Sequence, residues 1–198
     1  NRSRLLIYPL ILFVMAETII QVALPELHVT WLCVTLLSVL YFIYCSEMWN
    51  QLDALTGLLN QNSYLKQTGE VRCKGGVLVV FDVDDFKQIN DRYGHIQGDL
   101  CLAGIAECIK KSYANFGYCY RIGGDEFCVL LKNGGNEGRC KQEFLQRLQE
   151  KRGEIAFLPT VSYGSAPFSG EDIVKVKDRA DQDMYQYKKE RKNRKRLS

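Results

Sequence analysis

Two short acidic clusters have the residue types and the setting that metal-dependent phosphate chemistry needs. Asp82–Asp85 (DVDD) follows directly after an apolar run at 77–81, and the second cluster closes the segment 123–126 (GGDE). Magnesium prefers oxygen ligands and usually takes one or two carboxylates together with substrate phosphates. Glycines at a turn let the backbone approach a ligand closely. Each cluster is therefore a candidate metal site, although each alone also fits an ordinary helix cap or turn.

The elements that must position these clusters alternate between strands and helices. Val77–Phe81 (VLVVF) is a continuous β-branched and aromatic run, which predicts a strand buried on both faces. Strands at 118–122 and 127–131 flank the glycines and predict a hairpin. A further strand is expected at 160–165, and helices are expected at 46–59, 61–69, 86–93 (capped by Asp84 or Asp85), 98–113, 137–151 and 172–188. This alternation predicts an α/β or α+β fold.

The composition excludes several classes of protein. The 198 residues are 46% hydrophobic and 25% charged, which excludes a disordered or collagen-like chain. The eight cysteines form no C-x-x-C pair, so we expect no zinc site and read them as small buried side chains in a reducing compartment. No helix-turn-helix or aromatic-interleaved basic pattern is present, so we expect no nucleic-acid partner. The chain begins with Asn, and we expect it to be a piece of a longer protein.

Residues 1–45 differ in character from the rest of the chain. The stretches 5–24 and 27–45 are almost wholly apolar, and about 20 such residues suffice for a helix to cross a bilayer. We therefore expect a hairpin of two transmembrane helices that contacts membrane lipid through residues 5–45, followed by a short linker helix at 46–52. Arg2 and Arg4 favour a cytoplasmic N-terminus, which predicts a multi-pass protein of the inner membrane with residues 46–198 in the cytoplasm. Glu17 is either a packing or sensing contact with other helices or a protonated or snorkelling side chain.

The basic tail at 188–198 sets the sign of the net charge. The whole chain carries a formal charge of +3, while KKERKNRKR at 188–196 alone holds seven basic residues and one acidic residue. Such a run is either a solvated, partly frayed helix end or a surface for anionic lipid or nucleotide phosphates.

Three motifs that follow one another in the sequence resemble the GGDEF family, the diguanylate cyclases. Arg121–Phe127 (RIGGDEF) is similar to the family signature, Asp53–Asn60 (DALTGLLN) to its opening motif, and Phe81–Asp99 (FDVDDFKQINDRYGHIQGD) to its central motif. The resemblance covers 53–194 and implies a palm-like fold, similar to nucleotidyl cyclases and polymerases, with a mostly antiparallel central sheet flanked by helices. It also implies that two GTP molecules are condensed into cyclic di-GMP with loss of two pyrophosphates. Each domain would hold one GTP, so the active form would be a homodimer of these domains.

The same resemblance implies roles for individual residues, with Mg²⁺ or Mn²⁺ as cofactor. Metal would be held by Asp82, the backbone carbonyl of Val83, Asp125 and Glu126, and the last two would be the catalytic residues, with Asp125 near the attacking hydroxyl. The positions implied for substrate are Lys87 at the terminal phosphates with the backbone of Asp85 and Phe86, Asn90 and Asp99 at the guanine edge, Gly123 and Gly124 at the α-phosphate, and Lys188 and Lys192 at phosphates. An aspartate at position 99 favours GTP over ATP, because a carboxylate accepts from the N1–H and 2-amino groups of guanine.

The chain departs from the family pattern at two places. Members with product feedback carry Arg-x-x-Asp shortly before the signature, whereas this chain has Asn115–Tyr118 (NFGY) there. The tail motif usually has a glycine where this chain has Arg191, which leaves the contact of Lys192 open. The alternative function is a catalytically inactive GTP-binding or dimerising regulatory module. Intact acids at 82, 125 and 126 favour the enzyme.

Overall fold

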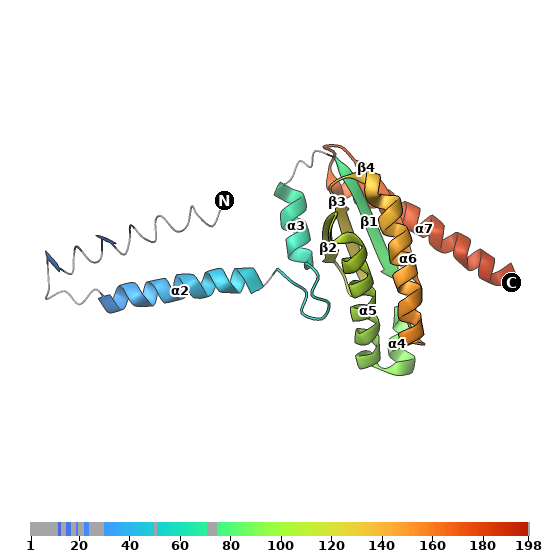
Figure 1. The fold of residues 1–198 in the computed structure, drawn as a ribbon, viewed down its shortest axis with the longest axis horizontal. Coiled ribbons are helices and arrows are strands. Elements are labelled where there is room, and N and C mark those ends of the chain that lie inside the picture. The colour runs from blue at the N-terminus through green and yellow to red at the C-terminus, as the bar shows by residue number, and fades with distance from the viewer. Residues whose placement is uncertain are drawn as a thin grey trace. The chain divides into compact units, whose positions relative to one another are not determined.

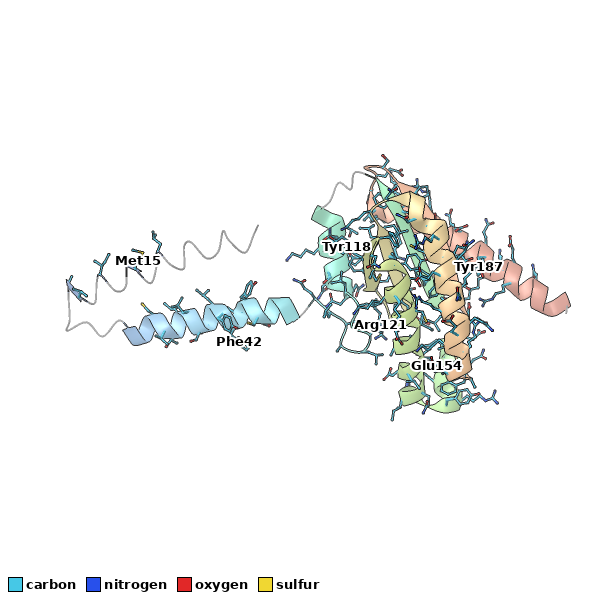
Figure 2. The ribbon with its side chains drawn as sticks, viewed as in Figure 1. Met15, Phe42, Tyr118, Arg121, Glu154 and Tyr187 are labelled. Carbon is cyan, nitrogen blue, oxygen red and sulfur yellow. The ribbon has the colours of Figure 1, made fainter. Side chains whose placement is uncertain are left out.

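The structure is a computed structural model that describes residues 12, 15, 16, 19, 22, 23, 30–49, 51–70 and 75–197. The chain divides into two compact units, 1–50 and 51–198. In the first unit, α2 (Thr30–Trp49) is a 20-residue helix, and most of its described large apolar side chains are exposed, among them Phe42 (Figure 2). Most of the stretch 5–24, including Glu17, lies outside the described residues. Over the described part of the chain, no helix combines the length and apolar character needed to cross a membrane, so the predicted transmembrane hairpin is not supported there.

The second unit is built on a four-stranded sheet in the order β2-β3-β1-β4, with each neighbouring pair antiparallel. Its elements in chain order are α3 (Gln61–Glu70), β1 (Gly76–Val83), α4 (Phe86–Tyr93), α5 (His95–Tyr113), β2 (Gly117–Arg121), β3 (Glu126–Leu131), the short helix η1 (Gly134–Asn136), α6 (Glu137–Glu154), β4 (Val161–Phe168) and α7 (Ile173–Leu197). This arrangement confirms the predicted α/β fold with an antiparallel sheet flanked by helices.

The central strand β1 is buried on both faces, as its unbroken apolar sequence predicts. Successive side chains of a strand point to opposite faces, so β1 contributes to two cores. Val79 and Phe81 pack in one core with residues of α5 and α6, whereas Leu78 and Val80 pack in the other with Tyr64 of α3 and residues of α7. Figure 1 shows α5 and α6 together on one side of the sheet and α7 leaving from behind it. The side chains of the even-numbered residues of β1 therefore face α7.

Helix α7 lies directly on β4 at Gly164. A Cβ atom at this position would come within 2.2 Å of both the carbonyl oxygen of Ala180 and the backbone nitrogen of Met184. Only glycine therefore allows this approach, which fixes how α7 crosses the sheet. The helix continues to Leu197, well past the end predicted at residue 188, so the basic tail is helical through residue 197.

The segment that opens the second unit is a turn rather than a helix. The prediction of a helix over 46–59, and of a linker helix over 46–52, holds to Trp49, where α2 ends, and is wrong from residue 51 onward. The carboxylate of Asp53 accepts from the Thr56 backbone N–H at 2.9 Å and from its hydroxyl at 2.6 Å, which closes a turn. Leu59 then joins the outer edge of β2, donating to the Cys119 carbonyl at 3.0 Å and accepting from the Arg121 N–H at 2.8 Å.

Candidate functional site

The two acidic clusters of the sequence meet at one end of the sheet. Asp82 near the end of β1 is directly opposite Glu126 at the start of β3. The backbone N–H of Val83 donates to the carbonyl oxygen of Asp125 at 3.2 Å. Residues directly opposite each other in antiparallel strands carry their side chains on the same face. The fold therefore brings four residues predicted to hold metal, at positions 82, 83, 125 and 126, to one place.

The glycine turn before β3 leaves room beside its backbone. Neither Gly123 nor Gly124 has a positive φ, so the turn itself does not require glycine. A Cβ at Gly124 would have no atom within 4 Å, whereas a Cβ at Gly123 would lie 3.2 Å from the Glu126 side chain. Glycine at position 124 thus keeps an open approach to the backbone, which suits a group that must come close to the main chain.

Arg121 at the end of β2 ties this turn to the opening segment, and Figure 2 labels it at the edge of the sheet. One terminal nitrogen, Nη1, lies 3.0 and 3.3 Å from the carboxylate oxygens of Asp53, and the other, Nη2, donates to the Gly124 carbonyl at 2.7 Å. Burial alone would raise the pKa of Asp53, but hydrogen bonds from Thr56 and Arg121 outweigh it and lower that pKa. The pair therefore stays ionised and holds the turn from one side. Both residues belong to the sequence motifs, but the contact between them was not predicted.

Helix α7 brings two cations, Lys188 and Arg191, to the acidic residues at the end of β1. The ammonium of Lys188 contacts the carboxylate of Asp82 and lies 3.5 Å from Oδ1 of Asp84, while Arg191 is ion-paired with Asp84. Burial opposes a charged lysine, yet the hydrogen bond and attraction of Asp82 raise the pKa of Lys188 overall. The predicted phosphate contact Lys188 is thus placed at the acidic end of β1. Lys192 lies in α7, but its side chain is outside the described part of the structure.

Asp84 is a structural acid in this arrangement, although the sequence grouped it with the candidate metal ligands. It is 4% exposed and accepts from the Ser162 hydroxyl at 2.8 Å and the Thr160 hydroxyl at 3.0 Å. Burial raises its pKa, but the bonds from Arg191, Ser162 and Thr160 outweigh that effect and lower it. The buried carboxylate is therefore charged and fully partnered.

The remaining predicted contacts lie around α4 and the start of α5. Asp85 begins α4 with a left-handed backbone (φ 55°) and its side chain makes no capping hydrogen bond, so the predicted side-chain cap is wrong. Lys87 is exposed and Phe86 is half-buried on α4. The amide oxygen of Asn90 is buried without a partner and would lie 1.9 Å from a Cβ at residue 98, so a residue larger than the glycine there would require the Asn90 side chain to move.

Asp99 is the next residue after that glycine and is exposed on α5, so the two predicted guanine contacts, Asn90 and Asp99, are neighbours in the fold. Helix α5 begins at His95, earlier than the predicted start at residue 98, because Gly94 (φ 85°) ends α4 and leads directly into it.

The donor set at the end of β1 fits a hard divalent cation in its chemistry. Asp82, the Val83 carbonyl and Asp125 offer oxygen atoms only, and the open backbone at Gly124 lies at the same end of the sheet. Among the described residues there is no group of three or more His, Cys, Asp or Glu side chains placed to hold a metal ion. Magnesium often takes only one or two carboxylates and completes its shell with water and substrate phosphates. These residues therefore fit a metal that arrives with a nucleotide.

Comparison with known proteins identifies the class of this fold and site. The chain belongs to the GGDEF family, since the family model described as "Diguanylate cyclase, GGDEF domain" matches residues 50–194. Diguanylate cyclase DgcS of Shewanella oneidensis is 32% identical over 154 residues, which are 74% of this chain and 52% of DgcS. Diguanylate cyclase DgcZ of Escherichia coli is 29% identical over 165 residues, 78% of this chain and 55% of DgcZ. The chain thus spans about half the length of these two relatives.

The solved structures include a similar domain with a nucleotide bound. The GGDEF domain of DgcB from Caulobacter crescentus, in complex with c-di-GMP, has a TM-score of 0.56 and 27% identity to this chain, covering 70% of this chain and 88% of that one.

Proposed function

We propose that this protein is a diguanylate cyclase that condenses two GTP molecules into cyclic di-GMP and releases two pyrophosphates. The observation that supports it most is the sheet register, which sets Asp82 opposite Glu126 and brings the Val83 N–H to the Asp125 carbonyl beside the open glycine turn. The relatives named above are diguanylate cyclases, and the family pattern of acids is intact in this chain.

In the proposed reaction, the 3′-hydroxyl of one GTP attacks the α-phosphorus of the other, and the bond to pyrophosphate breaks. Asp82, the Val83 carbonyl and Asp125 would hold magnesium, or manganese, which neutralises charge on phosphate oxygens when it is bound. Asp125 would lie near the attacking hydroxyl and assist its deprotonation, with Glu126 beside it. Lys188 carries a positive charge at the same end of β1 and would meet the phosphates once they displace it from Asp82.

The substrate would lie across the loop between β1 and α4. The exposed amine of Lys87 and the backbone at 85–86 would meet the terminal phosphates, while the open backbone at Gly124 would admit the α-phosphate. Asn90 and Asp99 would bind the guanine edge. Because one domain would bind one GTP and the reaction joins two, a second copy of the domain must supply the other nucleotide, and positioning of the two is a large part of the catalysis.

Product feedback through the family's Arg-x-x-Asp site is not part of the proposal. The position of its aspartate is held by Tyr118 on β2, whose ring has the Lys132 ammonium 4.6 Å from its centre. An aromatic ring covered by a lysine offers no carboxylate there.

A product assay tests the function. The protein is incubated with GTP and Mg²⁺, and nucleotides are separated by chromatography. Asp125→Ala should lower the rate of cyclic di-GMP formation by at least about a hundredfold, because a charged group beside the reacting atoms is lost. The matched control Asp178→Ala, an exposed acid on α7, should keep the wild-type rate. Tight GTP binding without product from the wild type would instead favour the regulatory-module alternative.

The location of the protein at an inner membrane, with residues 46–198 in the cytoplasm, is a separate proposal. It is supported by the apolar composition of residues 5–45 and the exposed apolar side chains of α2. Fractionation of cells that express the full chain should recover it with lipid in the membrane pellet. Recovery in the supernatant without detergent would contradict the proposal and leave the enzymatic one untouched.

A further inference from the structure

Arg191 joins three chain segments at the acidic end of β1. It lies on α7 three residues after Lys188, so the two side chains share one face of the helix. Its terminal nitrogen Nη2 contacts the carboxylate of Asp84 and donates to the Thr160 hydroxyl at 2.7 Å, and Nη1 donates to the Val161 carbonyl at 3.2 Å. One guanidinium therefore bridges the residue after β1, the start of β4 and the distal part of α7.

This anchor is made entirely by the chain's own residues. Asp84 is buried, and a buried carboxylate is stable in its charged form only when cations and hydrogen-bond donors satisfy it. The hydroxyls of Ser162 and Thr160 supply two donors, and Arg191 supplies the paired cation. The planar fork of an arginine suits such a bridge, because it can donate in two directions from one rigid group.

Lys188 lies between two fixed points of α7. On one side, the helix backbone at Met184 rests against Gly164 of β4, one turn before Lys188. On the other side, Arg191 fixes the helix about one turn later. A lysine has a flexible four-carbon stem, so the place where its ammonium rests depends on how firmly its own turn of helix is held. In this chain that turn is held on both sides, with the ammonium at Asp82.

We propose that Arg191 is a positioning residue: by anchoring the distal turns of α7 to Asp84, it holds Lys188 where the phosphates of the nucleotide arrive. A glycine, which the family pattern has at this place, carries no side chain that could make the anchor. The inference rests on the proposed function, since it concerns how the same site receives GTP.

A double-mutant cycle tests the proposal through binding. The variants are Arg191→Ala, Lys188→Ala and the two combined, and the measurement is the Kd for a non-hydrolysable GTP analogue with Mg²⁺, together with KM and kcat for GTP. Each single change should weaken binding about tenfold, and the double variant should bind about as weakly as Lys188→Ala alone. A residue that contributed to binding independently of Lys188 would instead give losses that multiply, to about a hundredfold. A residue that only stabilised the fold would leave the Kd of the folded protein unchanged.

Two further variants complete the experiment. Arg179→Ala removes another arginine of α7, whose partner is Glu171 at 2.7 Å and not an acid of the site. This variant should leave the Kd unchanged. Arg191→Lys keeps the charge but not the fork, so its Kd should fall between wild type and Arg191→Ala; it also replaces Arg191→Ala in the cycle if that variant does not fold.

Losses of affinity that multiply in the double variant, or a wild-type Kd in Arg191→Ala, would overturn the inference. The proposed function would still stand as long as the wild type binds GTP. A wild type that neither binds nor converts GTP would overturn both.

Discussion

Replacing Gly164 with alanine would drive a methyl group into the backbone of α7. The new Cβ would lie 2.2 Å from the Ala180 carbonyl oxygen and the Met184 nitrogen, and both are main-chain atoms that no side-chain rotation can move away. Real Cβ contacts are at least 3.0 Å, so the helix would have to shift by about 0.8 Å along this contact. Interiors are close-packed and transmit such shifts to their neighbours.

Overpacking of this kind typically costs 1–3 kcal/mol, and we expect a loss of about 2–3 kcal/mol because backbone rather than side chain is displaced. For a domain of this size that corresponds to a fall in Tm of roughly 5–10 °C. Thermal and urea unfolding of the variant and wild type measure it. The matched control is Gly153→Ala on α6, where a Cβ meets no atom within 4 Å, and alanine should be neutral or stabilise the helix by up to about 1 kcal/mol.

The same variant has a second readout at the site. Lys188 follows Met184 by one turn of α7, so the shift should carry its ammonium away from Asp82 and weaken binding of a GTP analogue by several-fold under conditions where the variant is folded. A Gly164→Ala protein with the wild-type Tm and urea midpoint would refute the reasoning, because it would mean that α7 does not lie this close to β4.

Two more predictions concern other parts of the second unit. Asp53→Asn should lower stability at pH 7 by about 1–2 kcal/mol, since it removes the charged partner of the part-buried Arg121. The pKa of Asp53 is lowered in the folded state, so the wild-type pair contributes fully above the unfolded pKa of about 4 and loses its contribution as the pH falls through the lowered, folded-state pKa. The stabilities of variant and wild type should therefore converge as the pH falls, and a constant difference would contradict the assignment. Five thiols should resist an aromatic disulfide reagent in the native protein and react after denaturation, because burial raises their pKa values, to about 11 for Cys101 and about 12 for Cys119. Mass spectrometry of the labelled protein identifies them, and rapid native labelling of any would disprove the buried placement of Cys101, Cys108, Cys119, Cys128 and Cys140.

Much of the fold could be predicted because its signals are local. The apolar run of β1 indicates a strand with both faces covered, and the predicted limits of α4 coincide with the observed Phe86–Tyr93. The start of α5 differs from the prediction by three residues, because a glycine in the sequence, such as Gly98, usually signals a helix boundary. In the structure that glycine lies inside α5 against the Asn90 side chain, a contact between two helices that no local pattern carries.

The candidate site, too, could be predicted only in part. The motifs identify its acids and glycines, and the sheet register brings them together, as it does Asp82 and Glu126. The contacts that hold them were missed, because Arg121 and Asp53 are 68 residues apart and Arg191 and Asp84 are 107 apart. Their partnership follows only from the order of strands in the sheet and from the path of α7 across it.

The attachment of Leu59 to β2 also bears on how copies of the chain can associate. An uncovered edge strand presents free N–H and C=O groups that invite the strand of another molecule. Here Leu59 already occupies the Cys119 carbonyl and the Arg121 N–H, so the outer border of β2 is closed at these positions by the chain itself. Addition of a strand from another molecule is therefore blocked at these positions of β2, so copies that associate along this border must do so through side-chain surfaces, which can form and separate without disturbing the sheet.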